Sequence, residues 1–237
     1  MTPTTLDECV RPTTIDEVIG QSSAKKLVQS VINSGERRCL LFFGPPGTGK
    51  TTLARIVGRG LQGPDFPADG EPDVLEINAA DFAAADGIRD LVRNTQSVPF
   101  QGKYRVIILD EAHQLSITAQ NVLLKPFEER NSINVWIICT TDPEKLIPAL
   151  RTRCTTIKLE PLSPKERVEL IKIANGVLFP PDVNSEGESL EKFIEEVQNQ
   201  ELSLPRDIMK AMQTWHDGLS AREAVELRLP RRPRRNP

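Results

Sequence analysis

Short strand-like runs alternate with amphipathic stretches along the chain up to about residue 160. The runs cover residues 39–43, 74–78, 104–109, 135–139 and 156–159, and the continuously apolar run 39–43 is suited to a strand buried on both faces of a sheet. Apolar residues between them recur at helical spacing, for example in a helix that Ser22 or Ser23 is expected to cap, at Ala24, Leu27, Val28, Val31 and Ile32. This alternation predicts an α/β fold, in which a parallel five-stranded sheet carries helices on both faces and binds ligands at the carboxyl ends of its strands.

The strand pattern stops near residue 160, and only helical patterns follow it. They predict helices at about 164–177, 190–198 and 205–215, which suffice for a small helical lid domain. We therefore expect a first domain over residues 1–160, a lid over 161–218, and a short helix with a basic tail over 219–237. The tail is expected to be disordered, because prolines punctuate its arginines: Arg228, Arg231, Arg232, Arg234 and Arg235.

The composition is that of a soluble protein, with 38% hydrophobic and 27% charged residues among 237. No apolar run approaches the length of about 18 residues that spans a membrane, and the N-terminus lacks the features of a signal peptide. We therefore expect a cytoplasmic protein without a membrane partner. The net charge of −3 gives no global attraction for nucleic acid, so any such binding needs local basic patches or helix N-termini.

The cysteines Cys9, Cys39, Cys139 and Cys154 are scattered singly, and no C-x-x-C pair occurs. With only two histidines in the chain, this pattern does not support a zinc site. We expect buried free thiols.

One segment carries the spacing of a phosphate-binding loop, G-x-x-x-x-G-K-[ST], between an apolar run and a helical pattern. It consists of Gly44, Pro45, Pro46, Gly47, Thr48, Gly49, Lys50 and Thr51, with Thr52 directly after it. Backbone N–H groups of such a loop and of the following helix converge on one anion. We expect Lys50 to reach the β- and γ-phosphates of a nucleoside triphosphate and Thr51 to hold Mg²⁺. The alternative is an ordinary glycine-rich turn.

Asp110 and Glu111 follow the strongest strand pattern, so they are expected at the same sheet edge as the loop. Asp110 would complete the magnesium shell, and Glu111 would orient and deprotonate the water that attacks the γ-phosphate. The alternative is a pair of acids that caps the next helix.

Five further segments can be compared with known families: DEAHQLS at 110–116, NVLLK at 121–125, EE at 128–129, TTDPEKL at 140–146 and TRC at 152–154. Together they closely resemble AAA+ clamp-loader ATPases of the bacterial DNA polymerase III gamma/tau type, with replication factor C small subunits as similar relatives. At 152–154 that family usually has Ser-Arg-Cys. Two departures stand out. The sequence shows neither the four-cysteine zinc module that bacterial relatives carry near residues 62–73 nor a collar domain after the lid.

The resemblance implies roles for further residues. Thr141 corresponds to the sensor near the γ-phosphate, Asn78 to a residue that restrains the catalytic glutamate, and Arg153 to an arginine finger that acts on a neighbouring subunit's ATP. Arg206 resembles the second sensor, although Pro205 replaces the residue expected before it. The adenine would lie beside residues near the N-terminus: Val10, Arg11, Pro12, Val18 and Ile19. Each of these residues also has an ordinary structural interpretation.

The resemblance implies a Mg²⁺-dependent ATPase, active mainly when assembled, that opens a sliding clamp and places it on primed DNA. Its partners would be the clamp, the DNA and other clamp-loader subunits in a ring or spiral of about five. Arg89, Arg93 and Lys103 are candidate DNA contacts, or they form a solvated surface. The alternatives are another AAA+ DNA-processing ATPase, of the branch-migration or recombination-factor type, and an ATP-switch subunit that hydrolyses little.

Overall fold

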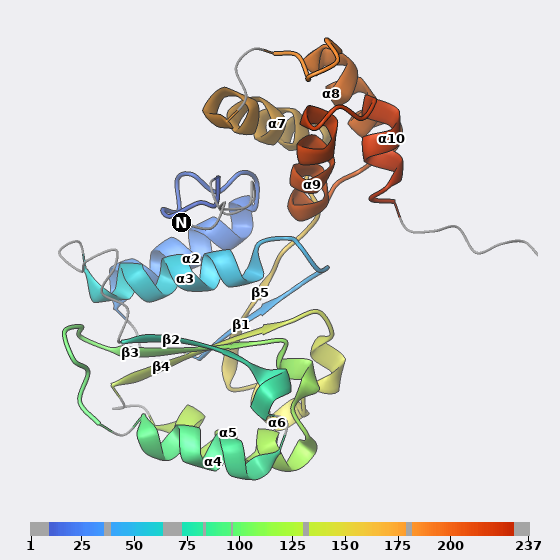
Figure 1. The fold of residues 1–237 in the computed structure, drawn as a ribbon. Coiled ribbons are helices and arrows are strands. Elements are labelled where there is room, and N and C mark those ends of the chain that lie inside the picture. Colours follow the sequence, from blue (N-terminus) through green and yellow to red (C-terminus); the bar gives the residue numbers. More distant parts are fainter. Residues whose placement is uncertain are drawn as a thin grey trace, which may run out of the picture. The chain divides into compact units, whose positions relative to one another are not determined.

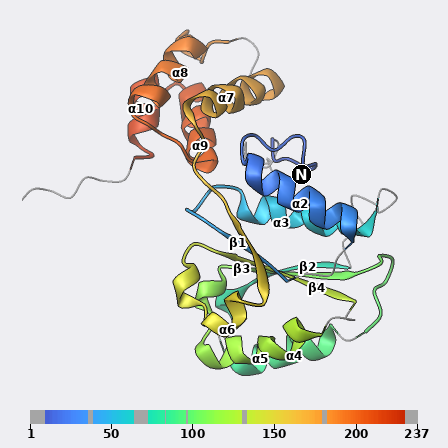
Figure 2. The ribbon, with the colours of Figure 1, turned by 180° about the vertical axis from the view of Figure 1, so that it is seen from behind.

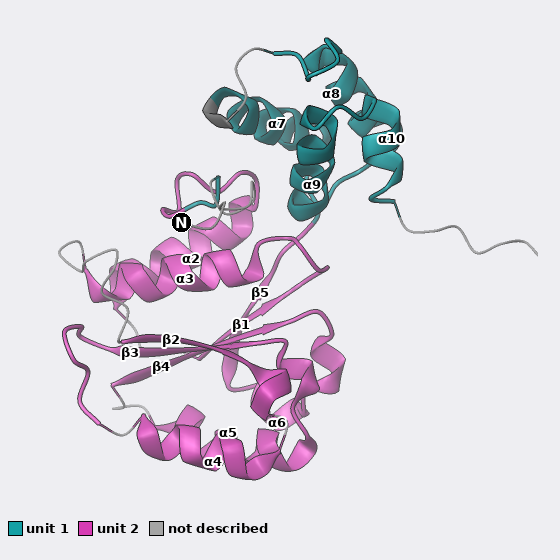
Figure 3. Cartoon of the chain, viewed as in Figure 1, with its two compact units in different colours: residues 1–12, 161–237 teal, residues 13–160 magenta. Residues whose placement is uncertain are grey.

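The computed structural model describes residues 10–35, 39–63, 73–82, 84–95, 97–129, 133–178 and 182–229. The chain divides into two compact units, one of residues 13–160 and one of residues 1–12 with 161–237 (Figure 3). The expectations for Cys9, for most of the segment 62–73 and for the tail beyond residue 229 lie outside the described residues.

The unit of residues 13–160 is built on a five-stranded sheet in which every pairing is parallel (Figure 1). Its order is β2-β3-β4-β1-β5. The strands are β1 (Cys39–Phe43), β2 (Val74–Asn78), β3 (Arg105–Asp110), β4 (Asn134–Thr140) and β5 (Cys154–Lys158). The prediction of a parallel α/β sheet is confirmed. Strand β5 begins two residues before its apolar pattern, because Cys154 and Thr155 pair in register with Cys39 and Leu40 of β1.

Helices cover both faces of this sheet, as Figures 1 and 2 show from opposite sides. One face carries α2 (Ser22–Ser34) and α3 (Lys50–Gln62); the other carries α4 (Ala85–Asn94), α5 (Ile117–Glu128) and α6 (Pro148–Arg151). Short 3₁₀ helices follow the strand ends: η1 (Ala79–Phe82), η2 (Ala112–Gln114) and η3 (Pro143–Lys145). A separate hydrophobic core lies on each face of the sheet, and successive residues of β1 point into different cores. Phe42 packs towards α2 and α3, and Leu41 packs towards α4 and α5. This explains why the three central strands, β1, β3 and β4, carry continuous apolar runs, whereas the edge strands β2 and β5 also contain polar residues.

The start of α2 differs from its prediction. Gln21, not a serine, occupies the N-cap position, with φ of 55° and no side-chain cap, so the expectation that Ser22 or Ser23 caps the helix is wrong. The Gln21 amide instead pairs with the backbone of Glu160, donating to its carbonyl at 2.6 Å and accepting from its N–H at 3.1 Å. This contact ties the first helix to the chain that leaves β5.

The second unit contains α7 (Pro164–Leu178), α8 (Leu190–Asn199), α9 (Pro205–His216) and α10 (Ala221–Glu226). Phe193 of α8 stacks on Trp215 of α9, with ring centroids 5.0 Å apart. The Glu188 carboxylate accepts hydrogen bonds from the Trp215 indole at 2.8 Å and from the Ala221 N–H at 2.6 Å. Helix α10 therefore packs with α8 and α9 in one unit, whereas the sequence suggested a lid that ends at residue 218.

The described cysteines are free thiols. Cys139 is buried, and Cys39 and Cys154 are half-buried side by side on neighbouring strands. Burial raises the pKa of Cys39 to about 12 and raises the pKa values of Cys139 and Cys154 as well. All three thiols are therefore protonated at neutral pH, as expected for packing residues.

Candidate functional site

The site lies at the carboxyl edge of the sheet, where four strands end side by side. The parallel register places Phe43 next to Thr140, and Asn78 next to Asp110. The phosphate loop follows β1, and Glu111 follows β3. The topology alone therefore brings these distant segments together.

The phosphate loop requires glycine where the backbone passes closest to its neighbours. A Cβ on Gly44 would lie 2.3 Å from the Leu159 carbonyl oxygen, so no larger residue fits there. Gly49 is the N-cap residue of α3, with φ of 96°, which favours glycine. Inside the loop, the buried Lys50 ammonium donates to the carbonyls of Gly44 and Pro45 at 3.0 and 2.9 Å. The carbonyls of the loop thus hold the positive charge of Lys50 within the loop.

Thr51 and Asp110 connect the loop to β3. The Thr51 hydroxyl donates to Asp110 Oδ2 at 2.7 Å, and the other carboxylate oxygen accepts the Glu111 N–H at 2.9 Å. A hydroxyl and a carboxylate in contact are oxygen ligands of the kind that Mg²⁺ prefers. The pair fits the metal position that the sequence suggested.

Glu111 has a strained backbone and a connected side chain. Its φ of 51° costs a non-glycine residue about 1 to 3 kcal/mol, and such strain gathers at functional sites. Its carboxylate lies 3.4 Å from His113 Nδ1, and that nitrogen lies 3.3 Å from the Thr140 hydroxyl. The sequence pattern indicated no role for His113 or Thr140, because only the folded chain shows that β4 ends beside Glu111.

Two predicted site residues, Asn78 and Thr141, form no hydrogen bond with Glu111 within the described residues. The exposed Asn78 accepts the Ala80 N–H at 3.1 Å. Thr141 is half-buried just beyond β4, whereas its neighbour Thr140 is buried, faces His113 and accepts the Asp142 N–H. The link from Glu111 to the end of β4 therefore runs through Thr140 rather than Thr141.

Gln120 is a further residue that the sequence did not single out. This buried α5 side chain donates to the carbonyls of Leu115 and Lys145 at 3.0 and 3.1 Å and accepts the Ile147 N–H at 2.7 Å. Leu115 follows η2, and Ile147 precedes α6. The segment after Glu111 is thereby joined to the segment that leads to Arg153.

The remaining site predictions fall on both compact units. Val18 and Ile19 belong to the sheet unit, whereas Val10, Arg11 and Pro12 belong to the helical unit, as does Arg206 in the first turn of α9.

The candidate DNA contacts on α4 are paired with acids. Arg89 pairs with Asp86 at 2.5 Å and Arg93 with Asp90 at 3.3 Å, so neighbouring acids offset both charges. Lys103 is exposed. These pairings weaken the support for a DNA-binding patch on α4.

The loop after α4 displays apolar side chains on a fixed backbone. Val98 is 81% exposed and Phe100 is 76% exposed. The buried Asp73 carboxylate accepts backbone N–H groups of Phe100, Gln101 and Gly102 at 2.6 to 2.7 Å. Burial by itself raises the pKa of Asp73, but these hydrogen bonds and Arg105 outweigh it, so the pKa lies below its ordinary 3.8. The ionised carboxylate therefore holds the loop at neutral pH.

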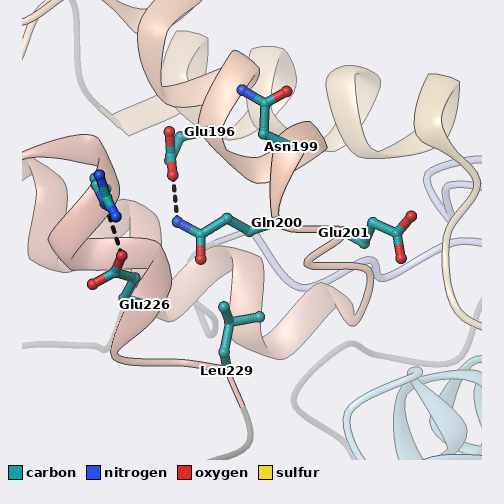
Figure 4. Close-up of a pocket in the computed structure, with 7 residues that line it drawn as sticks. Glu196, Asn199, Gln200, Glu201, Glu226 and Leu229 are labelled. Atoms are coloured by element: carbon teal, nitrogen blue, oxygen red, sulfur yellow. Dashed lines mark hydrogen bonds and ion pairs between the residues drawn. The ribbon is translucent and has the colours of Figure 1, made fainter. Parts of the chain in front are cut away.

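The helical unit has a cavity of about 460 Å³ that is acidic (Figure 4). Glu196, Glu201 and Glu226 line it; Glu196 accepts a hydrogen bond from Gln200, and Glu226 pairs with Arg222. A surplus of carboxylates repels phosphate. This cavity is not a candidate for the nucleotide.

A family model described as "DNA polymerase III, delta subunit" matches residues 20–163. The chain belongs to this clamp-loader family. It is 36% identical over 170 residues to replication factor C subunit 3 of Saccharomyces cerevisiae, covering 71% of this chain and 48% of the yeast protein. It is also 36% identical over 161 residues to the DNA polymerase III subunit gamma/tau of Mycobacterium bovis, covering 60% of this chain and 28% of that protein. The chain thus spans about half the length, or less, of these relatives, and its resemblance to clamp-loader ATPases is confirmed.

Solved structures of a RuvB Holliday junction branch migration motor from Thermotoga maritima share the fold. One has a TM-score of 0.69 and 24% identity, covering 93% of this chain and 72% of that one. At that identity the likeness confirms the AAA+ fold alone. Within the described residues, no helix is both long and apolar enough to cross a membrane.

Proposed function

We propose that the chain is the ATP-hydrolysing part of a sliding-clamp loader, which opens the clamp and places it on primed DNA. The observation that carries the proposal is the Thr51–Asp110 hydrogen bond, because it joins the phosphate loop to the strand end that bears Glu111 in a chain of this family. Lys50 would bind the β- and γ-phosphates, and Thr51 and Asp110 would hold Mg²⁺. When bound, the ion neutralises charge on the transferred phosphoryl group.

Glu111 is the proposed general base. It orients the attacking water and accepts its proton, with His113 fixing the carboxylate from the side. Arg153 supplies positive charge to the ATP of a neighbouring subunit as the γ-phosphoryl group leaves. Thr141 as sensor, Asn78 as restraint on Glu111, and Arg206 as second sensor remain proposals, as do the adenine contacts of Val10, Arg11, Pro12, Val18 and Ile19.

Turnover is proposed to depend on assembly with other clamp-loader subunits in a ring or spiral. The matched relatives are themselves named as subunits. A finger that acts between subunits leaves an isolated chain with an incomplete site, so the assembled form should be the active one.

We propose that the clamp contacts the loop of Val98 and Phe100. Exposed apolar side chains on a fixed backbone favour protein binding, since little ordering is needed on contact.

Primed DNA would bind through its phosphates without sequence preference. Of the candidate contacts Arg89, Arg93 and Lys103, the two arginines pair with acids, so Lys103 is the one whose charge is least neutralised.

ATP turnover of the chain, measured with and without primed DNA and the clamp of the same organism, tests this function. Stimulation of ATP turnover by both ligands together supports a clamp loader. In that case Phe100→Ser should abolish the part of the stimulation that the clamp causes. Stimulation by branched DNA without any clamp effect would indicate a branch-migration motor instead. Tight ATP binding without turnover under any condition would indicate a switch subunit.

A further inference from the structure

Arg153 is held by two neighbours on different helices. Its Nε and Nη2 both donate to one carboxylate oxygen of Glu128, with Nε at 3.0 Å. Its Nη1 donates to the Ala149 carbonyl at 2.5 Å. Glu128 is the last residue of α5, and Ala149 lies in α6. The guanidinium is therefore fixed from two sides, although its side chain is 30% exposed.

The contacts leave part of the guanidinium available. An arginine side chain has five N–H donors, one on Nε and two on each Nη. Glu128 and Ala149 engage one N–H on each nitrogen, so one remains on Nη1 and one on Nη2 within the described structure. Two such donors form the fork that binds two phosphate oxygens. The structure thus combines a restrained side chain with a free pair of donors.

We propose that Glu128 is the positioning residue of Arg153, holding the guanidinium in the rotamer that meets the neighbouring subunit's γ-phosphate. The inference rests on the proposed role of Arg153 as a finger between subunits. A long side chain loses rotamer entropy when it is ordered, and the Glu128 contact imposes that loss before the subunits meet. Because the Glu128 side chain is itself 57% exposed, solvent weakens the ion pair and lets the guanidinium adjust to phosphate.

The support beneath Glu128 is rigid. The buried Gln120 of the same helix bonds to Lys145 and Ile147, which lead directly into α6 and Arg153. Helices α5 and α6 therefore hold Glu128 and Arg153 in a constant relation. The adjacent Glu129 is exposed and forms no hydrogen bond or ion pair within the described residues, which makes it the matched control.

The test compares Glu128→Ala, Glu128→Asp, Glu129→Ala and Arg153→Ala, each checked for an unchanged melting temperature, in the ATPase stimulated by DNA and clamp. We expect Arg153→Ala to lower kcat about a hundredfold and Glu128→Ala about tenfold with KM unchanged. Glu128→Asp should recover part of the loss, and Glu129→Ala should match the wild type. Glu128→Ala should add nothing in an Arg153→Ala background, because the pair acts as one unit.

Wild-type or raised kcat in Glu128→Ala would overturn the inference; a raised value would mean that Glu128 restrains the finger. An additive loss in the double variant would also overturn it, since Glu128 would then act elsewhere. If Arg153→Ala itself keeps full stimulated turnover, the finger role of the proposed function fails instead. The two failures are therefore distinguishable.

Discussion

The hydroxyl of Thr51 donates a hydrogen bond of 2.7 Å to Oδ2 of Asp110, although the two residues lie 59 positions apart. This contact places the end of the phosphate loop against the strand end that bears the proposed base. Asp110→Asn should bind ATP as the wild type does in EDTA, but Mg²⁺ should no longer raise its ATP affinity, because an amide is a weaker Mg²⁺ ligand than a carboxylate. Fluorescent-nucleotide titrations with and without Mg²⁺ measure this, and an undiminished Mg²⁺ effect would place the metal elsewhere.

Lys50→Ala should abolish measurable nucleotide binding. The Lys50 ammonium is buried within the loop, and its removal takes away the charge aimed at the β- and γ-phosphates. Lys172→Ala, which removes an exposed lysine of α7, is the control. Wild-type ATP affinity in Lys50→Ala would refute the assignment of the loop.

Glu111→Gln should bind ATP normally and turn it over about 10² to 10⁴ times more slowly, because the amide still hydrogen-bonds a water but cannot take its proton. Single-turnover hydrolysis in the assembled form separates this chemical step from binding. Full turnover in the variant would mean that another group is the base.

The strands, their parallel direction and the loop follow from the sequence, because they depend on local apolar runs, on the alternation of strands with helices and on glycine spacing. The contacts that complete the site do not. The start of α2 at Gln21 could not be recognised from the sequence. The side-chain amide of Gln21 does not cap the helix and instead hydrogen-bonds to the backbone of Glu160, 139 residues later in the chain. The approach of Thr140 to His113, and of Glu128 to Arg153, depends on strand order and helix packing, which spacing along the chain does not encode.

Asp73→Asn should destabilise the protein by about 2 kcal/mol at neutral pH, because the ionised carboxylate accepts three backbone N–H bonds. The folded pKa lies below the ordinary 3.8, so this stabilisation is present above pH 3.8 and is lost as the pH falls through the folded value. In urea unfolding measured from pH 7 to 3, the free energy of unfolding of the wild type should approach that of Asp73→Asn as the pH falls. Asp86→Asn, at an exposed carboxylate, is the control and should change the free energy of unfolding little. A difference between wild type and Asp73→Asn that stays constant over this pH range would contradict the assigned role of Asp73.

Hydrolysis is proposed to need residues from two subunits, and mixing two inactive variants tests this claim most directly. Arg153→Ala subunits keep an intact phosphate site but lack the finger, whereas Lys50→Ala subunits keep the finger but bind no ATP. Each alone should show almost no turnover stimulated by DNA and clamp. Mixed assemblies should recover a substantial part of the wild-type rate wherever a Lys50→Ala subunit presents its finger to an Arg153→Ala site. If mixed assemblies demonstrably form and stay inactive, Arg153 does not act between subunits, and the claim is wrong.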